Sequence, residues 1–255
     1  MTIPSLSLNG KIAVITGGRR GMGRAFALAF AEAGAGVAVC DKVVEDGELS
    51  ALSAEIKKMG RSSIALQVDI TRKADVHNMV KRVEGELGGI DILVNNAAII
   101  IRKPLIELEE DEWDQVVDID LKGAFLCSQA VAKGMMERKK GNIINMASRG
   151  AFKPNKNTGA YDIAKAGVVL LTRMLAVELA SYKIRVNAIA PGPVKTKFNE
   201  SVWSNPEHLR ASAASIPLGR WAEPGDIVGS ALFLASDASS FITGHTILVD
   251  GGIMA

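Results

Sequence analysis

Cysteine and histidine are scarce in this chain of 255 residues. The two cysteines, Cys40 and Cys127, lie in apolar surroundings, which is typical of buried thiols in a reducing compartment. The three histidines, at positions 77, 208 and 245, are far apart and match no metal-ligand spacing. We therefore expect a cytoplasmic protein without a metal site.

Long apolar runs and an excess of one charge are also missing. The run from Ala25 to Ala31 ends at Glu32, far short of the ~20 residues that cross a bilayer. The opening stretch MTIPSLSLNGK has neither the basic nor the apolar region of a secretory signal. The formal net charge of +2 is too small to indicate the basic surface of a nucleic-acid-binding protein. We therefore expect neither a membrane nor a nucleic acid as a partner.

Short β-rich runs alternate with amphipathic stretches along the whole chain. Several runs are continuously apolar, as strands of a parallel sheet are when helices cover both faces. The alternation predicts an α/β fold: one Rossmann-type domain over residues 1–255, with a doubly wound parallel sheet of about seven strands and helices on both faces. The expected strands are 11–16, 36–41, 63–69, 90–96, 142–148, 184–190 and 245–250, and the expected helices are 21–33, 45–59, 72–87, 112–138, 158–181 and 224–235. Residues 191–223 contain four prolines and are expected to form a partly helical substrate lid.

The stretch TGGRRGMG (16–23) lies between the first expected strand and the first expected helix. Gly17, Gly21 and Gly23 allow a tight turn and close approach of a ligand to the backbone. The N-terminus of the helix offers free N–H groups and a partial positive charge, which suit a pyrophosphate. A plain glycine-rich turn is the alternative, but the position between strand and helix favours a dinucleotide site.

Asp41 ends the second expected strand, eighteen residues after Gly23. A carboxylate at this distance accepts hydrogen bonds from an adenine ribose and repels a 2′-phosphate. Arg20 and Lys42 favour the opposite preference, because either can pair with such a phosphate. The carboxylate at the ribose position favours NAD over NADP, and a solvated strand end is the alternative interpretation of Asp41.

Tyr161, one of only two tyrosines, is joined to Lys165 in the stretch AYDIAKAG. On a helix, residues i and i+4 share a face, so the ammonium would lie beside the phenol. A packing tyrosine near a surface lysine is the common case. The alternative is a phenol whose pKa, about 10 when free, is lowered by the ammonium so that it acts as a base near neutral pH.

With these two patterns together, the chain resembles the short-chain dehydrogenase/reductase family almost from end to end. The matching segments, in chain order, are TGGRRGMG (16–23), Asp69 in LQVDI, NNAA (95–98), Ser148 thirteen residues before Tyr161, PGPVKT (191–196) and VDGG (249–252). Ala98 replaces a glycine of the family pattern. Asp120, in VVDIDLKGAF, stands where the family has the asparagine of its catalytic group.

The resemblance implies roles for individual residues. Tyr161 would move the proton, Lys165 would also hold the nicotinamide ribose, and Ser148 would donate a hydrogen bond to the substrate oxygen. The implied catalytic residues are Ser148, Tyr161, Lys165 and Asp120. The implied cofactor contacts are Gly17, Arg20, Gly21, Met22, Gly23, Asp41, Asp69, Ile70, Asn96, Ala97, Tyr161, Lys165, Pro191, Gly192, Val194 and Thr196. The expected substrate contacts are Ser148, Arg149, Lys153 and Trp203.

These patterns predict an NAD-dependent alcohol dehydrogenase or carbonyl reductase, which transfers a hydride between nicotinamide and a secondary alcohol or ketone. Basic and polar side chains in the lid and after Ser148 favour a small hydrophilic substrate such as a sugar, polyol or hydroxy acid. An NADPH-dependent 3-oxoacyl reductase is the alternative within the class. A non-catalytic nucleotide-sensing protein is the alternative from another class. The resemblance also implies a homotetramer.

Overall fold

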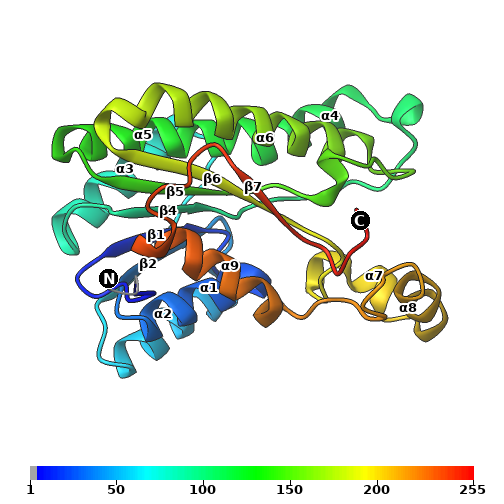
Figure 1. The fold of residues 1–255 in the computed structure, drawn as a ribbon, viewed down its shortest axis with the longest axis horizontal. Coiled ribbons are helices and arrows are strands. Elements are labelled where there is room, and N and C mark those ends of the chain that lie inside the picture. The colour runs from blue at the N-terminus through cyan, green and yellow to red at the C-terminus, as the bar shows by residue number, and fades with distance from the viewer. Residues whose placement is uncertain (1–4) are drawn as a thin grey trace.

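The computed structural model describes residues 5–255, which form a single parallel sheet with helices on both faces (Figure 1). The strands are β1 (Ile12–Thr16), β2 (Gly36–Asp41), β3 (Ser63–Gln67), β4 (Ile92–Asn95), β5 (Gly141–Met146), β6 (Ile184–Pro191) and β7 (Thr246–Val249), in the spatial order β3-β2-β1-β4-β5-β6-β7. The helices are α1 (Gly21–Glu32), α2 (Glu48–Lys58), α3 (Lys73–Glu86), α4 (Glu110–Val117), α5 (Gly123–Arg138), α6 (Gly159–Leu179), α7 (Glu200–Trp203), α8 (Pro206–Ala213) and α9 (Pro224–Ala235). The predicted doubly wound sheet is confirmed.

Two apolar layers hold the helices on the sheet. Phe26 and Phe30 of α1 lie with Leu52 of α2 on one face, where α9 also packs. Met79 of α3 and Met135 of α5 lie on the opposite face (Figure 1). All five side chains are buried, and burial of each contributes ~1.5–3 kcal/mol. The continuous apolar strands are therefore covered from both sides, as their sequences require.

The predicted helix over 112–138 is not continuous. Residues Asp118–Lys122 form a π-helical turn between α4 and α5, where the N–H of Gly123 bonds to the carbonyl oxygen of Asp118, five residues earlier. A π turn adds one residue to the helical circuit and changes the direction of the side chains that follow. Asp120 is thereby buried, with 2 % of its surface exposed. Simple 3.6-residue periodicity gives no sign of such a turn.

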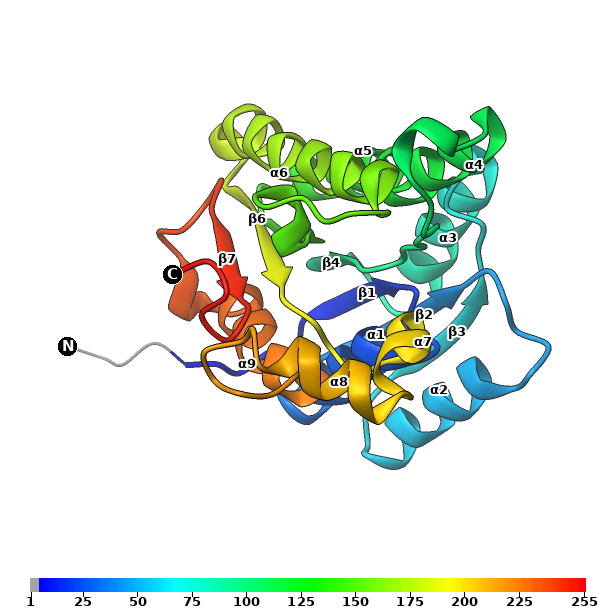
Figure 2. The ribbon, with the colours of Figure 1, turned by 90° about the vertical axis from the view of Figure 1, so that its right-hand side faces the viewer.

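The carboxyl ends of the strands meet at one edge of the sheet, where α7 and α8 lie across them (Figure 2). Both helices belong to segment 191–223, so its partly helical character is confirmed. The sheet order changes direction between β1 and β4, and ligands of open α/β sheets bind beside such a point. Within residues 5–255, no helix has the length and apolar character to cross a membrane.

Candidate active site

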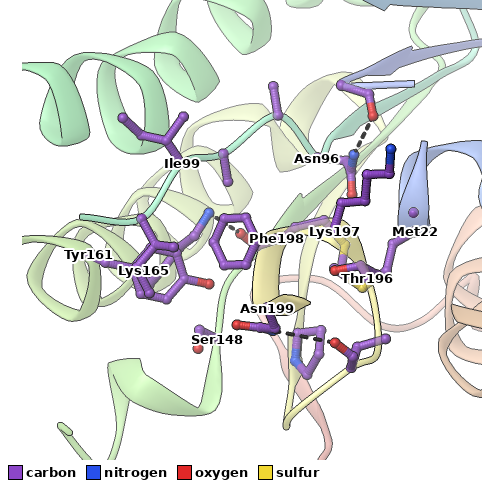
Figure 3. Close-up of a pocket in the computed structure, with 18 of the residues that line it drawn as sticks. Met22, Asn96, Ile99, Ser148, Tyr161, Lys165, Thr196, Lys197, Phe198 and Asn199 are labelled. Atoms are coloured by element: carbon purple, nitrogen blue, oxygen red, sulfur yellow. Dashed lines mark hydrogen bonds between the residues drawn. The ribbon is translucent and has the colours of Figure 1, made fainter. Parts of the chain in front are cut away.

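A single cavity of about 580 Å³ runs along the carboxyl ends of the strands. All the implied cofactor contacts line it except Gly23, which packs behind the glycine turn. Ser148, Tyr161 and Lys165 line the same cavity, together with part of segment 191–223 (Figure 3). The fold therefore brings the predicted nucleotide residues and the predicted catalytic residues into one continuous site.

The glycine turn is held by backbone contacts that leave no room for side chains. A Cβ on Gly23 would lie 2.2 Å from the oxygen of Gly17, and a Cβ on Gly17 would lie 2.7 Å from Cα of Ala97. The side-chain amide of Asn96 donates to the carbonyl oxygens of Thr16 (3.1 Å) and Gly17 (2.9 Å), as Figure 3 shows in part. Asn96, implied as a cofactor contact, thus fixes the shape of the turn. The resulting close turn at the start of α1 fits a dinucleotide pyrophosphate.

The end of β2 carries a cluster of charge that the sequence reasoning missed. Arg19 is buried, and its Nε lies 3.7 Å from Oδ1 of Asp41. Its guanidinium also pairs with Asp46 and lies 3.6 Å from Oε2 of Glu48. Arg20, which we expected to contact cofactor, is exposed and lines the cavity. The two consecutive arginines in TGGRRGMG indicate that one of them could pair with Asp41. The sequence alone does not show that Arg19, and not Arg20, is the buried one.

Asp69 lies farther along the same cavity. Its Oδ1 accepts hydrogen bonds from the hydroxyl (2.7 Å) and the N–H (3.0 Å) of Thr71, and its Oδ2 lies 2.9 Å from Nζ of Lys42. Burial opposes ionisation, but these bonds and the lysine charge outweigh it and hold the pKa of Asp69 at about 2. Asp69 is therefore a fixed negative acceptor at the adenine end of the cavity.

Tyr161 and Lys165 lie one turn apart on α6, as the sequence predicted. Nζ of Lys165 is 5.5 Å from the centre of the Tyr161 ring (Figure 3). The ammonium donates a hydrogen bond to the carbonyl oxygen of Met146 at 3.0 Å. The lysine is buried, so the surface-lysine alternative does not apply.

Asp120 reaches the same ammonium from the π-helical turn. Its Oδ2 lies 3.2 Å from Nζ of Lys165, and its Oδ1 accepts a 2.9 Å hydrogen bond from the N–H of Ile99. Burial raises the pKa of Asp120, while the lysine charge and the Ile99 N–H oppose that rise. The departure from the family pattern thus places a buried, ion-paired carboxylate next to the ammonium of Lys165.

The expected lowering of the Tyr161 pKa by Lys165 does not occur in this structure. Burial raises the pKa of Tyr161 above its ordinary value, and the negative charge of Asp120 raises it further. The Ser148 hydroxyl opposes the rise. The physical reason for the difference is first the burial of the phenol, which disfavours its charged form, and second the negative charge of Asp120.

Ser148 lies at the end of β5, where a short 3₁₀ turn, η3 (Arg149–Ala151), begins. Its Oγ accepts the N–H of Gly150 at 3.0 Å. Because the oxygen is engaged as an acceptor, the hydroxyl proton is available for donation toward the cavity. Such a donor stabilises negative charge that develops on a reacting oxygen.

Segment 191–223 contributes different residues from those expected. Phe198 packs against Tyr161, with ring centres 5.7 Å apart, and Asn199 accepts a 2.7 Å hydrogen bond from Nη2 of Arg102. Trp203 does not line the cavity, because its indole N–H donates to the carbonyl oxygen of Thr196 at 2.7 Å. Lys153 is exposed and also lies outside the cavity lining. Arg149 does line it.

The whole arrangement fits a nicotinamide dinucleotide laid from Asp41 and Asp69, past the glycine turn, to Lys165 and Tyr161. A phenol, a hydroxyl and a buried ammonium then surround the place where an alcohol would lie. This set can hold an alcohol oxygen and move its proton, which is what hydride transfer from the neighbouring carbon requires.

Comparisons with known proteins agree with this geometry. A family model described as "Enoyl-(Acyl carrier protein) reductase" matches residues 17–254. A 2-dehydro-3-deoxy-D-gluconate 5-dehydrogenase from Formosa agariphila is 38% identical over 100% of this chain and 97% of its own length. A hydroxy(phenyl)methylsuccinyl-CoA dehydrogenase subunit from Thauera aromatica is 40% identical over 97% of this chain and 98% of its own.

A solved structure is similar over almost the whole length of the chain. The gluconate 5-dehydrogenase from Burkholderia cenocepacia, in complex with NADP and tartrate, is 34% identical, with a TM-score of 0.94 over 99% of this chain and 98% of that one. The match spans the glycine turn, the catalytic helix and segment 191–223 alike. The chain belongs to the short-chain dehydrogenase/reductase family of oxidoreductases.

Proposed function

We propose that the protein is an NAD-dependent dehydrogenase of sugar acids. The observation that carries the proposal is the charge of the cavity, whose lining includes four basic residues besides Lys165 and those at the end of β2 and the glycine turn: Arg102, Arg149, Lys156 and Lys197. Guanidinium and ammonium groups bind a carboxylate through charge-assisted hydrogen bonds. The names of the gluconate-type relatives support the same substrate class.

The chain's own residues divide the chemistry between them. Tyr161 accepts the proton of the substrate hydroxyl during oxidation and returns it during reduction. Ser148 donates a hydrogen bond to the same oxygen, and Lys165 is held between Asp120 and the carbonyl oxygen of Met146. Bound NAD supplies the hydride acceptor and, through its positive ring, a charge that favours the phenolate. This full catalytic set argues against a non-catalytic nucleotide sensor.

The preference for NAD rests on the charges at the end of β2. Asp41 lies at the ribose position, and Arg19 is already shared among Asp41, Asp46 and Glu48. A 2′-phosphate there would meet three carboxylates and an arginine that they neutralise. A related structure contains NADP, so the preference is tested by measuring kcat/KM with NAD and with NADP.

The substrate class is tested by a matched panel. Gluconate-type sugar acids, the neutral sugars and polyols of the same length, and a hydroxyacyl thioester are offered with NAD and with NADP. We expect the sugar acid to exceed its neutral analogue in kcat/KM by about tenfold or more, the typical effect of a charge-assisted hydrogen bond. Equal use of the two would contradict the proposal. Preference for the thioester would favour the acyl-type alternative that the Thauera aromatica relative suggests.

We also propose a cytoplasmic homotetramer. Two free, buried cysteines support a reducing location. Oligomerisation is supported by exposed apolar side chains in two separate places. Ile163, Leu170, Met174 and Val177 follow one another at helical spacing on α6, and Phe241 and Leu248 are exposed at the β7 edge. Two distinct self-complementary interfaces are what a tetramer with dihedral symmetry needs.

A further inference from the structure

Asp162 follows the catalytic tyrosine on α6 and is not accounted for by the chemistry above. It is 5 % exposed. Its Oδ2 accepts hydrogen bonds from the hydroxyl of Thr158 at 2.8 Å, from the N–H of Asn155 at 2.9 Å and, at 3.5 Å, from the side-chain amide of Asn155. One carboxylate oxygen thus fastens the last part of residues 149–158, which we call the substrate loop.

The second oxygen of Asp162 faces the beginning of the same loop. A Cβ on Gly150 would lie only 1.9 Å from Oδ1, so the glycine and the carboxylate are in close contact. This oxygen is buried and has no hydrogen-bond partner among the described residues. An unpaired buried oxygen is costly. Asp162, on the helix that carries Tyr161, therefore holds the end of the substrate loop by hydrogen bonds and packs against Gly150 at its beginning.

Arg149 connects this clamp to the cavity. Its Nη2 donates a 2.6 Å hydrogen bond to Oδ1 of Asn155. The side-chain amide of Asn155 is turned toward Asp162, which leaves its oxygen facing the guanidinium. Asp162, Asn155 and Arg149 thus form a chain of contacts that ends in a basic side chain on the cavity wall.

We propose that Asp162 is a positioning residue that holds Arg149 where it binds the carboxylate of the substrate. This inference rests on the proposed function, because it assigns Arg149 to a sugar acid. The main effect of Asp162 is on substrate binding. Its negative charge also contributes to raising the pKa of Tyr161, by less than burial or Asp120 does.

A carboxylate in the first turn of a helix also stabilises that helix, which is a purely structural role. The two roles differ in what they change. A structural role alters stability and the use of all substrates alike. A positioning role raises KM for the acid and leaves KM for the neutral analogue nearly unaffected.

The test compares Asp162→Ala, Asp162→Asn, Arg149→Met and the double variant Asp162→Ala/Arg149→Met, with Asp114→Ala on α4 as the control for loss of an exposed aspartate. We expect Arg149→Met to raise KM for the acid about 10- to 100-fold. Asp162→Ala should raise it about tenfold, with the dissociation constant of NAD within about twofold. Any change in kcat, which follows the loss of a negative charge near Tyr161, should be equal for the acid and the neutral analogue. Asp162→Asn keeps an acceptor oxygen and should recover part of the loss. The double variant should be no worse than Arg149→Met alone, because residues in one chain of contacts are not additive.

Equal effects of Asp162→Ala on KM for the acid and on KM for the neutral analogue would overturn the inference, as would multiplied losses in the double variant. If Asp162→Ala does not fold, Asp162→Asn carries the same comparison. Hydrogen exchange gives a readout that needs no substrate: the Asn155 amide should exchange faster in Asp162→Ala and normally in Asp114→Ala. An unchanged rate overturns the clamp itself. If the parent protein oxidises no sugar acid, the proposed function is wrong. The hydrogen-exchange result still tests whether Asp162 holds the substrate loop.

Discussion

At the scale of single residues, the buried carboxylate of Asp120, paired with Lys165, adds to the effect of burial on the ionisation of the Tyr161 phenol. A carboxylate that has lost its water is stabilised only by its partners, here one ammonium and one backbone N–H. Its negative charge acts on Tyr161 as well, and raises the phenol pKa. This residue therefore opposes the lowering that a lone lysine would give.

Asp120→Asn should lower the pKa of Tyr161, because a nearby negative charge is removed. The alkaline limb of the pH–rate profile for carbonyl reduction, where the phenol must be protonated, should then move to lower pH, with activity preserved or raised. Since the chain has only two tyrosines, titration of tyrosinate absorbance in a Tyr182→Phe background reports Tyr161 directly. If Tyr161 titrates at the same pH in the parent and in Asp120→Asn, Asp120 serves only as a structural acceptor for the N–H of Ile99. Outright loss of activity would point to Asp120 as a direct participant in binding or proton transfer.

Asp41→Ala should shift the cofactor preference toward NADP. The change removes both the ribose acceptor and a charge that repels a 2′-phosphate, and it frees Arg19 in part. We expect the ratio of kcat/KM for NADP to that for NAD to rise about tenfold, equivalent to ~1.4 kcal/mol. Glu32→Ala, on the exposed end of α1, is the control. An unchanged ratio would place the ribose elsewhere.

At the scale of elements, the sequence predicted the seven strands and the cofactor turn because each depends on local pattern. The continuous apolar run IAVIT predicts a buried strand, β1, from its own residues. The glycines of the turn predict that backbone segments lie close together there. The π-helical turn was not predicted, since apolar residues on both sides of it continue a helical pattern and a shift in its phase was not looked for. Trp203 and Lys153 were assigned to substrate from their polarity and position. Where each side chain points is decided by tertiary contacts, such as the bond from Trp203 to Thr196.

Gly23→Ala tests the cofactor turn as an element. The added Cβ would lie 2.2 Å from the oxygen of Gly17 and 2.6 Å from Nδ2 of Asn96, so the turn must move. We expect NAD affinity to fall about tenfold or more and stability to fall by ~1–3 kcal/mol. Gly229→Ala in α9 is a matched control, because its Cβ would meet nothing within 4 Å. That variant should gain ~1 kcal/mol by calorimetry. Equal behaviour of the two variants would contradict a closely packed turn.

At the scale of the whole molecule, the sheet order places the proposed nucleotide residues and the proposed catalytic residues on either side of the β1–β4 boundary, with α7 and α8 across the carboxyl ends of the strands (Figure 2). The helices that cover the sheet also carry apolar side chains that are exposed to solvent. Val177 is 78 % exposed and Leu170 is 60 % exposed, both on α6. A monomer rarely leaves such a row of apolar groups in water.

Leu170→Glu combined with Val177→Glu should therefore divide the proposed tetramer into smaller species, because buried unpaired charges at an interface are costly. Light scattering measures the mass, and Lys81→Glu on α3 serves as the control for an added acidic charge. A tetramer of unchanged mass would move the interface away from α6. A monomeric parent protein would reject the tetramer itself.

The most direct test of the account is Tyr161→Phe, measured for both sugar-acid oxidation and NAD binding. The phenol moves the proton, and the ring is only its scaffold, which packs against Phe198. We expect turnover to fall about 10²–10⁴-fold, the range for loss of general acid–base help, while the dissociation constant of NAD changes by less than about threefold. Tyr182→Phe should leave both quantities unchanged. A Tyr161→Phe enzyme that retains half of the parent's turnover would contradict the assignment of the site.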